Sequence, residues 1–232
     1  MADLAGHADI SVFDSRAMVY DTWFENEGKL IFDIEVKALQ EVLPLLPKPW
    51  LEVGVGSGRF AQALGIETGI DPSVRLVEMA QGRGITVFVA KGEERSFCEE
   101  AFGTVFLIMT LCFIDSPAAV LREACRILKP GGKIVLGVVL RESSWGTFYQ
   151  SKKMEGHHFY KYATFHSYQE IEGLLLDSGF TIEKFVSTLF QKPGEVKEVE
   201  LPKEGLSFKA GFTVIVAGKS IISRKGSKLT AG

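Results

Sequence analysis

Three glycines at alternate positions, Gly54, Gly56 and Gly58, follow a short apolar segment that also contains Glu52. Because glycine has no side chain, the backbone can bend tightly at these positions and approach a bound molecule closely. A helix that begins directly after the turn would point its free N–H groups and the positive end of its dipole at that molecule. The segment therefore predicts a binding site for a nucleotide-like cofactor.

The residues around this turn distinguish between classes of cofactor. A dinucleotide-binding turn has the pattern G-x-G-x-x-G, whose third glycine would fall at position 59, where this chain has Arg59. Asp71 ends the second predicted strand, and an ionised carboxylate there can accept hydrogen bonds from both hydroxyls of a ribose. Plainer interpretations are a tight bend without a ligand and an Asp71 that only caps the next helix. The combined pattern favours a ribose-containing cofactor.

Five motifs in order identify a resemblance to a known family. They are Glu52–Gly58, Gly69–Ser73, Gly92–Glu93, Met109–Phe113 and Arg126–Gly132. With them, the chain resembles class I S-adenosylmethionine-dependent methyltransferases, in the small-molecule branch that includes the ubiquinone- and menaquinone-biosynthesis enzymes. The similarity extends from about Tyr20 to Ala217. The resemblance implies S-adenosylmethionine as the cofactor and S-adenosylhomocysteine as the product.

The resemblance also assigns roles to individual residues. It places residues 52–58 at the methionine end of the cofactor, Asp71 at the ribose, residues 72–73 and 92–93 at the adenine, and residues 110–111 beside the transferring methyl group. The cofactor-binding residues so implied are Glu52, Gly54, Gly56, Gly58, Asp71, Pro72, Ser73, Gly92, Glu93, Thr110 and Leu111.

The acceptor side is predicted from aromatic segments. In the family, the region after the fifth strand and the N-terminal helix usually form a substrate lid, here residues 20–45 and 140–166. The substrate-pocket candidates are Tyr20, Trp23, Trp145, Tyr160 and His158. An aromatic pocket wall with a few orienting polar groups is the functional interpretation, and simple packing of the lid onto the domain is the alternative. A histidine could serve as a general base, but no catalytic residue is assigned.

Two other chemistries are disfavoured by the residue pattern. Cys112 lies near the predicted methyl site, but its Leu-Cys-Phe context indicates a packed thiol rather than a nucleophile. His157 and His158 are adjacent, so their side chains diverge, and no further ligand lies at a suitable spacing. No metal site is therefore predicted.

Alternating strands and helices must position these residues. Predicted strands at 50–54, 66–71, 85–90, 102–109 and 133–139 are separated by predicted helices, which is typical of a parallel sheet. A helix is predicted over 167–178 and further strands over 182–189 and 212–217. We expect an α/β, Rossmann-like, doubly wound sheet with helices on both faces. The resemblance implies seven strands in the order 3-2-1-4-5-7-6, with residues 212–217 antiparallel.

The predicted domain organisation is simple. Residues 1–19 are expected to be a loose lead-in, residues 20–218 a single methyltransferase domain, and residues 219–232 a basic tail. A helix is expected over about 29–43, and residues 140–166 show no clear period.

The composition limits the classes of partner that we expect. The chain has 232 residues, 46% hydrophobic residues and a net charge of −3, so neither nucleic acid nor membrane is expected as the main partner. No membrane span or signal peptide is predicted, and three cysteines without paired spacing indicate a cytoplasmic protein. The predicted function is methyl transfer to a small molecule by in-line displacement. The alternatives are a non-catalytic cofactor-binding sensor or partner subunit, and an RNA or protein methyltransferase. The oligomeric state is left open.

Overall fold

The computed structural model describes residues 10–220, in which helices pack on both faces of one eight-stranded sheet. The strands are β1 (Trp50–Val53), β2 (Thr68–Asp71), β3 (Thr86–Val89), β4 (Phe102–Ile108), β5 (Leu128–Val138), β6 (Phe180–Thr188), β7 (Lys203–Glu204) and β8 (Phe212–Lys219). The helices are α1 (Ile10–Ser15), α2 (Ala17–Trp23), α3 (Lys29–Gln40), α4 (Arg59–Leu64), α5 (Val74–Gly82), α6 (Pro117–Ile127), α7 (Ser144–Met154) and α8 (Tyr168–Asp177). Short 3-10 turns are η1 (Leu43–Leu45), η2 (Leu111–Phe113) and η3 (Tyr160–Tyr162).

The sheet order is β3-β2-β1-β4-β5-β8-β6-β7. Strands β3, β2, β1, β4 and β5 are parallel, whereas β8 is antiparallel to both β5 and β6. Because β8 is the seventh of the long strands along the chain, the predicted order and the antiparallel segment 212–217 are confirmed. The predicted count of seven was one short. The extra strand β7 has two exposed residues, Lys203 and Glu204, which form no apolar pattern that could announce it.

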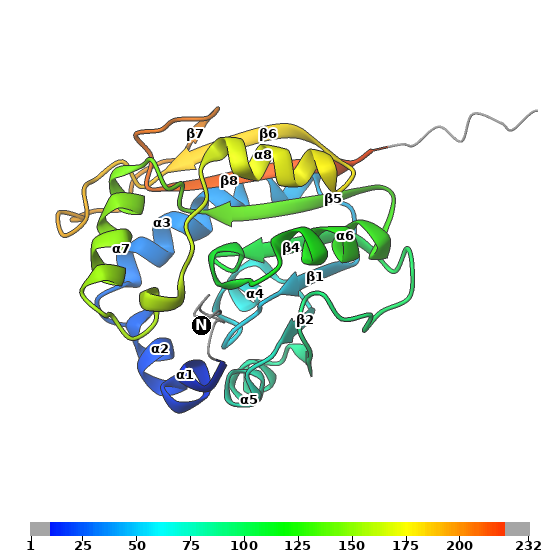
Figure 1. Ribbon diagram of the computed structural model, residues 1–232, viewed down its shortest axis with the longest axis horizontal. Coiled ribbons are helices and arrows are strands. Elements are labelled where there is room, and N and C mark those ends of the chain that lie inside the picture. The colour runs from blue at the N-terminus through cyan, green and yellow to red at the C-terminus, as the bar shows by residue number, and fades with distance from the viewer. Residues whose placement is uncertain (1–9, 221–232) are drawn as a thin grey trace, which may run out of the picture.

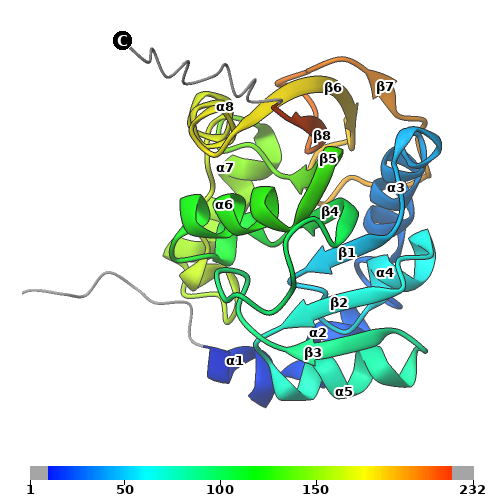
Figure 2. The same cartoon turned by 90° about the vertical axis from the view of Figure 1, so that its right-hand side faces the viewer.

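Two layers of core cover the sheet. Figure 2 shows α6 and α8 on one face and α3 and α4 on the other. All residues of β4 are buried, and they alternate between the layers, with Phe106 and Ile108 facing one cluster and Val105 and Leu107 the other. This is the burial expected of a central strand that reads as a continuous apolar run.

Caps and glycines set the boundaries of the helices that carry the site. Gly58 has a left-handed φ of 83° and starts α4, and the Ser73 hydroxyl accepts from the Leu76 amide at 3.2 Å at the start of α5. Ser167 and Glu170 form a capping box that starts α8. Pro117 is the first residue of α6, and the hydroxyl of Ser116 before it makes no capping hydrogen bond within the described residues.

The N-terminal segment differs from its prediction. Residues 1–19 were expected to be loose, yet α1 and the start of α2 lie within them. A helix of six residues is too short to display a helical period, so the sequence pattern did not reveal α1. Residues 1–9 and most of the predicted basic tail, residues 221–232, lie outside the described part of the chain.

Helices also fill the second predicted lid segment. Residues 140–166 showed no clear period because α7 is aromatic on several sides, and it is followed by the η3 turn. Figure 1 shows α1, α2 and α7 gathered at the end of the sheet to which the β4 and β5 arrows point, which is the carboxyl end of the parallel strands. Among residues 10–220, no helix combines the length and apolar character needed to cross a membrane.

Candidate functional site

A cavity of about 150 Å³ opens where β1, β2 and β4 end. Most of the residues predicted to bind the cofactor line it, from four separate segments of the chain. They are Gly54, Gly56, Asp71, Pro72, Gly92, Glu93 and Thr110. We call this space the glycine-turn cavity. It lies at the carboxyl edge of the parallel strands, where open α/β sheets commonly bind ligands.

Asp71 connects two segments that form the glycine-turn cavity. One carboxylate oxygen accepts from the Gly56 amide at 2.9 Å, and the other accepts from the Ser73 amide at 2.9 Å. Burial raises the pKa of Asp71 to about 6, although these two amide hydrogen bonds oppose the rise. The carboxylate therefore ties the glycine turn to the start of α5 and keeps further acceptor capacity for a ligand hydroxyl.

Glu52 lies beneath the turn rather than on the cavity wall. Its side chain is fully buried, and one oxygen, Oε2, has no hydrogen-bond partner among the described residues. The Ala61 amide at the first turn of α4 donates to the carboxyl group. Burial and the nearby Asp71 raise the pKa of Glu52 well above its ordinary value. An unpaired buried carboxyl oxygen is costly, so its presence suits a ligand with a positive group at this position.

Three further predicted residues stand behind the cavity wall. Gly58 allows the start of α4 to pack closely against Ile85, since an added Cβ would lie 2.6 Å from Ile85 Cδ1. Ser73 is buried and its hydroxyl donates to Asp14 Oδ1 of α1 at 2.6 Å. Leu111, the first residue of η2, is buried in the core. Their positions favour supporting roles over direct contact with a ligand.

Gly54 allows the turn to pass directly over the end of β4. Its φ is 73°, and an added Cβ would lie 2.2 Å from Thr110 Cγ2. The Thr110 hydroxyl in turn donates to the Gly54 carbonyl at 3.3 Å and to the Ile108 carbonyl at 3.0 Å. Two ends of neighbouring strands are thereby held together at the cavity floor.

We expect Gly54→Ala to lower the free energy of unfolding by about 3 kcal/mol, from the left-handed backbone and the clash with Thr110 together. Gly65 is a matched control, because it has the same φ of 73° and nothing within 4 Å of an added Cβ. Gly65→Ala should therefore cost only the backbone part, about 1 kcal/mol. Urea denaturation of the two variants measures the difference. Equal losses would contradict the proposed close contact.

A second cavity, of about 360 Å³, adjoins the first. Four residues line both: Phe13, Tyr20, Met109 and Phe113. Met109, at the end of β4, has a positive φ of 53°, which is unusual for a residue with a side chain. We call the second space the aromatic cavity, because rings from α1, α2, α7 and η3 form most of its wall.

The structure places only some of the predicted substrate-pocket residues on the wall of the aromatic cavity. Tyr20, Trp23 and Tyr160 line the aromatic cavity. Trp145 lines neither cavity, because its ring is 1% exposed, packs over Gly211 and donates from Nε1 to the Gln191 carbonyl at 2.8 Å. It is a core residue that anchors α7.

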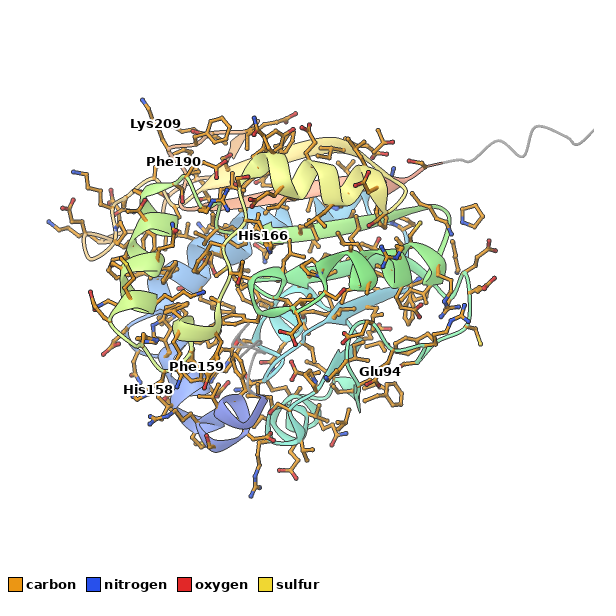
Figure 3. All side chains as sticks on the ribbon, in the orientation of Figure 1. Glu94, His158, Phe159, His166, Phe190 and Lys209 are labelled. Atoms are coloured by element: carbon orange, nitrogen blue, oxygen red, sulfur yellow. The ribbon has the colours of Figure 1, made fainter. Side chains whose placement is uncertain are left out.

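His158 also lines neither cavity, and its side chain is exposed. Its neighbours His157 and Phe159 take the place on the wall, with the Phe159 ring 5.4 Å from Phe13 and 5.9 Å from Tyr20. Figure 3 shows the labelled His158 and Phe159 beside the N-terminal helices, far from His166 along the lid. The structure therefore places His157, and not the predicted candidate His158, on the wall of the aromatic cavity.

Glu35 is a wall residue that the sequence analysis missed. It lies on α3, is only 4% exposed, and lines the aromatic cavity. No hydrogen bond or ion pair joins it to any other described residue. Burial raises its pKa to about 8. The helical spacing in the sequence could have identified Glu35, because it occupies the same helical face as Ile31 and Leu39, one turn away on either side.

An ion-pair cluster fixes the lid helix α2 to the glycine turn. The Asp21 carboxylate accepts from Arg59 Nη2 at 2.6 Å and from Arg83 Nη2 at 2.8 Å. Arg83 Nη1 also donates to the Ser57 carbonyl at 2.7 Å. Arg59, which replaces the glycine of a dinucleotide-binding turn, therefore has a docking role. Because Tyr20 precedes Asp21, the cluster also sets the position of the ring shared by both cavities.

Asp21→Ala should lower the free energy of unfolding by about 3 kcal/mol, since it leaves the largely buried Arg83 without a carboxylate and Arg59 with only the exposed Glu25. Burial raises the pKa of Asp21, but the arginine hydrogen bonds outweigh it and bring the pKa to about 2. Its stabilisation is thus present above about pH 4 and is lost as the pH falls toward 2.

Asp33→Ala is the control, because the Lys29–Asp33 pair is exposed and should contribute at most about 0.5 kcal/mol. Thermal unfolding at pH 7 and at pH 3 compares the three proteins. If Asp21→Ala behaved like Asp33→Ala, the cluster would not hold the lid.

Two alternative chemistries receive no support from the geometry. Burial raises the pKa of the Cys112 thiol to about 12, and its Sγ lies 3.6 Å from the Met109 carbonyl, so the thiol is protonated and packed. Within residues 10–220, no cluster of three or more His, Cys, Asp or Glu side chains could hold a metal ion.

The glycine-turn cavity thus combines a glycine cradle with a carboxylate oriented by two amides, and the unpaired carboxyl oxygen of Glu52 is buried beneath its turn. These groups fit a ligand with ribose hydroxyls and an ammonium group, as S-adenosylmethionine has.

Comparison with known proteins agrees with this chemistry. The sequence model of the family described as "Methyltransferase domain" matches residues 51–136. An uncharacterised protein of Methanocaldococcus jannaschii is 39% identical over 210 residues, which cover 90% of this chain and 100% of that protein. A ubiquinone biosynthesis O-methyltransferase of Pseudomonas putida is 28% identical over 150 residues, which cover 58% of this chain and 64% of that protein.

A solved structure is similar over nearly the whole described chain. It is a Thermotoga maritima protein described as an S-adenosylmethionine-dependent methyltransferase and possible histamine N-methyltransferase. The two share 39% sequence identity with a TM-score of 0.81, and the match covers 90% of this chain and 99% of that one.

Proposed function

Because this chain belongs to the class I S-adenosylmethionine-dependent methyltransferases, we propose that it methylates a small molecule bound in the aromatic cavity. One observation carries the proposal: the aromatic cavity and the glycine-turn cavity share the wall formed by Phe13, Tyr20, Met109 and Phe113. A cofactor in one cavity and an acceptor in the other would therefore meet at this wall.

The cofactor, S-adenosylmethionine, supplies a methyl group that its sulfonium already activates. In our proposal, Asp71 holds the ribose hydroxyls, residues 54–56 approach the methionine portion through their backbone, and Glu52 neutralises its ammonium group. Pro72, Gly92 and Glu93 flank the adenine. The chain then contributes alignment of the acceptor and exclusion of water, rather than a covalent intermediate.

The size and aromatic wall of the cavity beneath the lid favour a small molecule as the methyl acceptor. Residues 20–45 and 140–166 surround the aromatic cavity with rings on several sides, and α1 contributes the ring of Phe13. A cavity of about 360 Å³ lies within the usual range for small-molecule sites. The names of the relatives extend from O-methylation to possible N-methylation, so they do not select the acceptor atom.

Fractionated extract tests the proposal. Methyl transfer from labelled S-adenosylmethionine is measured with the small-molecule filtrate and with the retained RNA and protein. We expect label in the filtrate products and none in the retained fraction; the reverse result would favour an RNA or protein methyltransferase.

Two tyrosines of the same turn provide a matched pair for this assay. Tyr160 lines the aromatic cavity, whereas Tyr162 does not. Tyr160→Leu should reduce methyl transfer at least tenfold while the affinity for S-adenosylhomocysteine stays the same, and Tyr162→Leu should change neither. Equal behaviour of the two variants would remove the aromatic cavity as the acceptor site.

A further inference from the structure

The wall of the aromatic cavity has an uneven distribution of charge. Its acidic members are Glu35 and Glu27, and no lysine or arginine is among the described residues that line it. Its one histidine is His157, whose pKa burial lowers, so the imidazole adds no positive charge at neutral pH. The charge therefore favours a cationic occupant over an anionic one.

Glu35 is the group that requires a partner. A carboxyl group that is 4% exposed and has no hydrogen bond among the described residues would normally be replaced by an apolar residue. The titratable groups that approach it are Tyr149 of α7 and Tyr160 of η3, and burial keeps both of them protonated and neutral. Neither of these groups can balance an ionised Glu35.

The rings beside Glu35 add a second feature that favours a cation. The Tyr149 and Tyr160 rings lie 4.4 Å apart, and both tyrosines are close enough for the charge of Glu35 to affect them. Trp23 and Phe24 contribute further ring surface to the cavity. Aromatic faces attract an organic ammonium group most strongly where water is excluded.

We propose that the methyl acceptor is an organic amine, held as a cation by Glu35 and the surrounding rings, and that Glu35 takes the proton which the amine must lose. This inference rests on the proposed function. An ammonium nitrogen has no free electron pair, so its proton must leave before methylation. Burial brings the pKa of Glu35 to about 8. That value lies within about 2–3 units of an ordinary alkylammonium group, which makes the transfer accessible.

The step balances as follows. A proton passes from the ammonium nitrogen to the Glu35 carboxylate. The nitrogen then forms a bond to the methyl carbon while the carbon–sulfur bond breaks and its electron pair stays on sulfur. The methylated amine carries the positive charge away, and Glu35 releases its proton to solvent.

Calorimetry with S-adenosylhomocysteine bound tests the inference without turnover. The probes are benzylamine and 2-phenylethylamine, each compared with the alcohol of the same skeleton, in two buffers of different ionisation enthalpy at pH 7. We expect each amine to bind at least tenfold more tightly than its alcohol. Because free Glu35 is mostly protonated at pH 7, about one proton should be released for each amine bound.

Glu35→Gln is the test variant, and Glu41→Gln, exposed at the end of the same helix, is the control. Glu35→Gln should bind the amines at least tenfold more weakly and without releasing a proton. Its affinity for the alcohols should be unchanged, and Glu41→Gln should behave as the native chain does. Amines that bind no better than alcohols, fail to bind, or bind equally to Glu35→Gln would overturn the inference. A native chain that did not bind S-adenosylhomocysteine would instead contradict the proposed function.

Discussion

Replacement of Asp71 by alanine is expected to weaken the binding of S-adenosylhomocysteine about 100-fold. Hydrogen bonds to a charged acceptor contribute about 1.5–3 kcal/mol each, so the loss of two ribose contacts removes about 3 kcal/mol. The substitution also releases the Gly56 and Ser73 amides, which Asp71 now holds at 2.9 Å. Titration calorimetry measures the affinity, and Glu78→Ala, on the exposed side of α5, is the control. Unchanged affinity would contradict the assignment of the glycine-turn cavity to the cofactor.

The same carboxylate should give the affinity a pH signature. Ribose hydroxyls donate to the ionised form of Asp71, whose pKa burial raises to about 6. The affinity should therefore be constant above pH 6 and fall about tenfold for each unit below it. Asp71→Asn keeps the size of the side chain but cannot ionise, so its weaker affinity should not vary through this range. A native affinity that is flat from pH 7 to pH 5 would show that the ligand does not use this carboxylate.

The sequence was sufficient for the parts of the site that depend on short segments. The glycine turn and Asp71 lie within one strand–helix–strand unit, and each has a chemical requirement that few residue types meet. Their spacing therefore predicted a cofactor cavity, whereas the sheet order around it was implied by the family resemblance. The glycines proved to have different functions, since Gly54 and Gly56 line the cavity while Gly58 serves close packing.

Contacts between distant segments could not be predicted in this way. The sequence pattern showed only that Arg59 replaces the third glycine of a dinucleotide-binding turn. It did not predict the ion pair with Asp21, which lies 38 residues earlier in the chain. The aromatic character of Trp145 makes it a candidate for the substrate pocket, but residue type alone cannot predict whether a ring faces a cavity or the core. Its contacts with Gly211 and Gln191 arise from a loop that closes only in the folded chain.

Glu35 is a different case, since its position on the apolar face of a helix was visible in the sequence. The helical period places Ile31, Ile34, Ala38 and Val42 on one face of α3, and Glu35 is the charged residue among them. A charged residue at a core position violates the local pattern, and such violations are expected mainly at functional sites. This makes the stability of the Glu35 variant as informative as its binding.

Glu35→Gln is accordingly expected to make the protein more stable at alkaline pH. Burial raises the pKa of Glu35 from 4.5 to about 8 in the folded chain. A raised folded pKa means that the stabilisation is complete below pH 4.5 and is lost as the pH rises through 8, because the folded chain must then bury an uncompensated charge. Glutamine has the same shape and no charge, so the variant escapes this loss. We expect the two proteins to be nearly equal at pH 5 and the variant to gain about 4 kcal/mol by pH 8.5.

Urea denaturation at pH 5, 7 and 8.5 measures this divergence, with Glu41→Gln as the exposed control that should follow the native chain throughout. Other buried carboxyls, such as Glu52 and Asp71, are common to all three proteins, so they cancel in the difference. Parallel curves for Glu35→Gln and the native chain would show that Glu35 is solvated or paired, which would remove the basis for an amine site. A variant that is more stable but binds amines poorly would show that this chain keeps a destabilising charge in its lid for the sake of its ligand, the usual exchange of stability for function at a binding site.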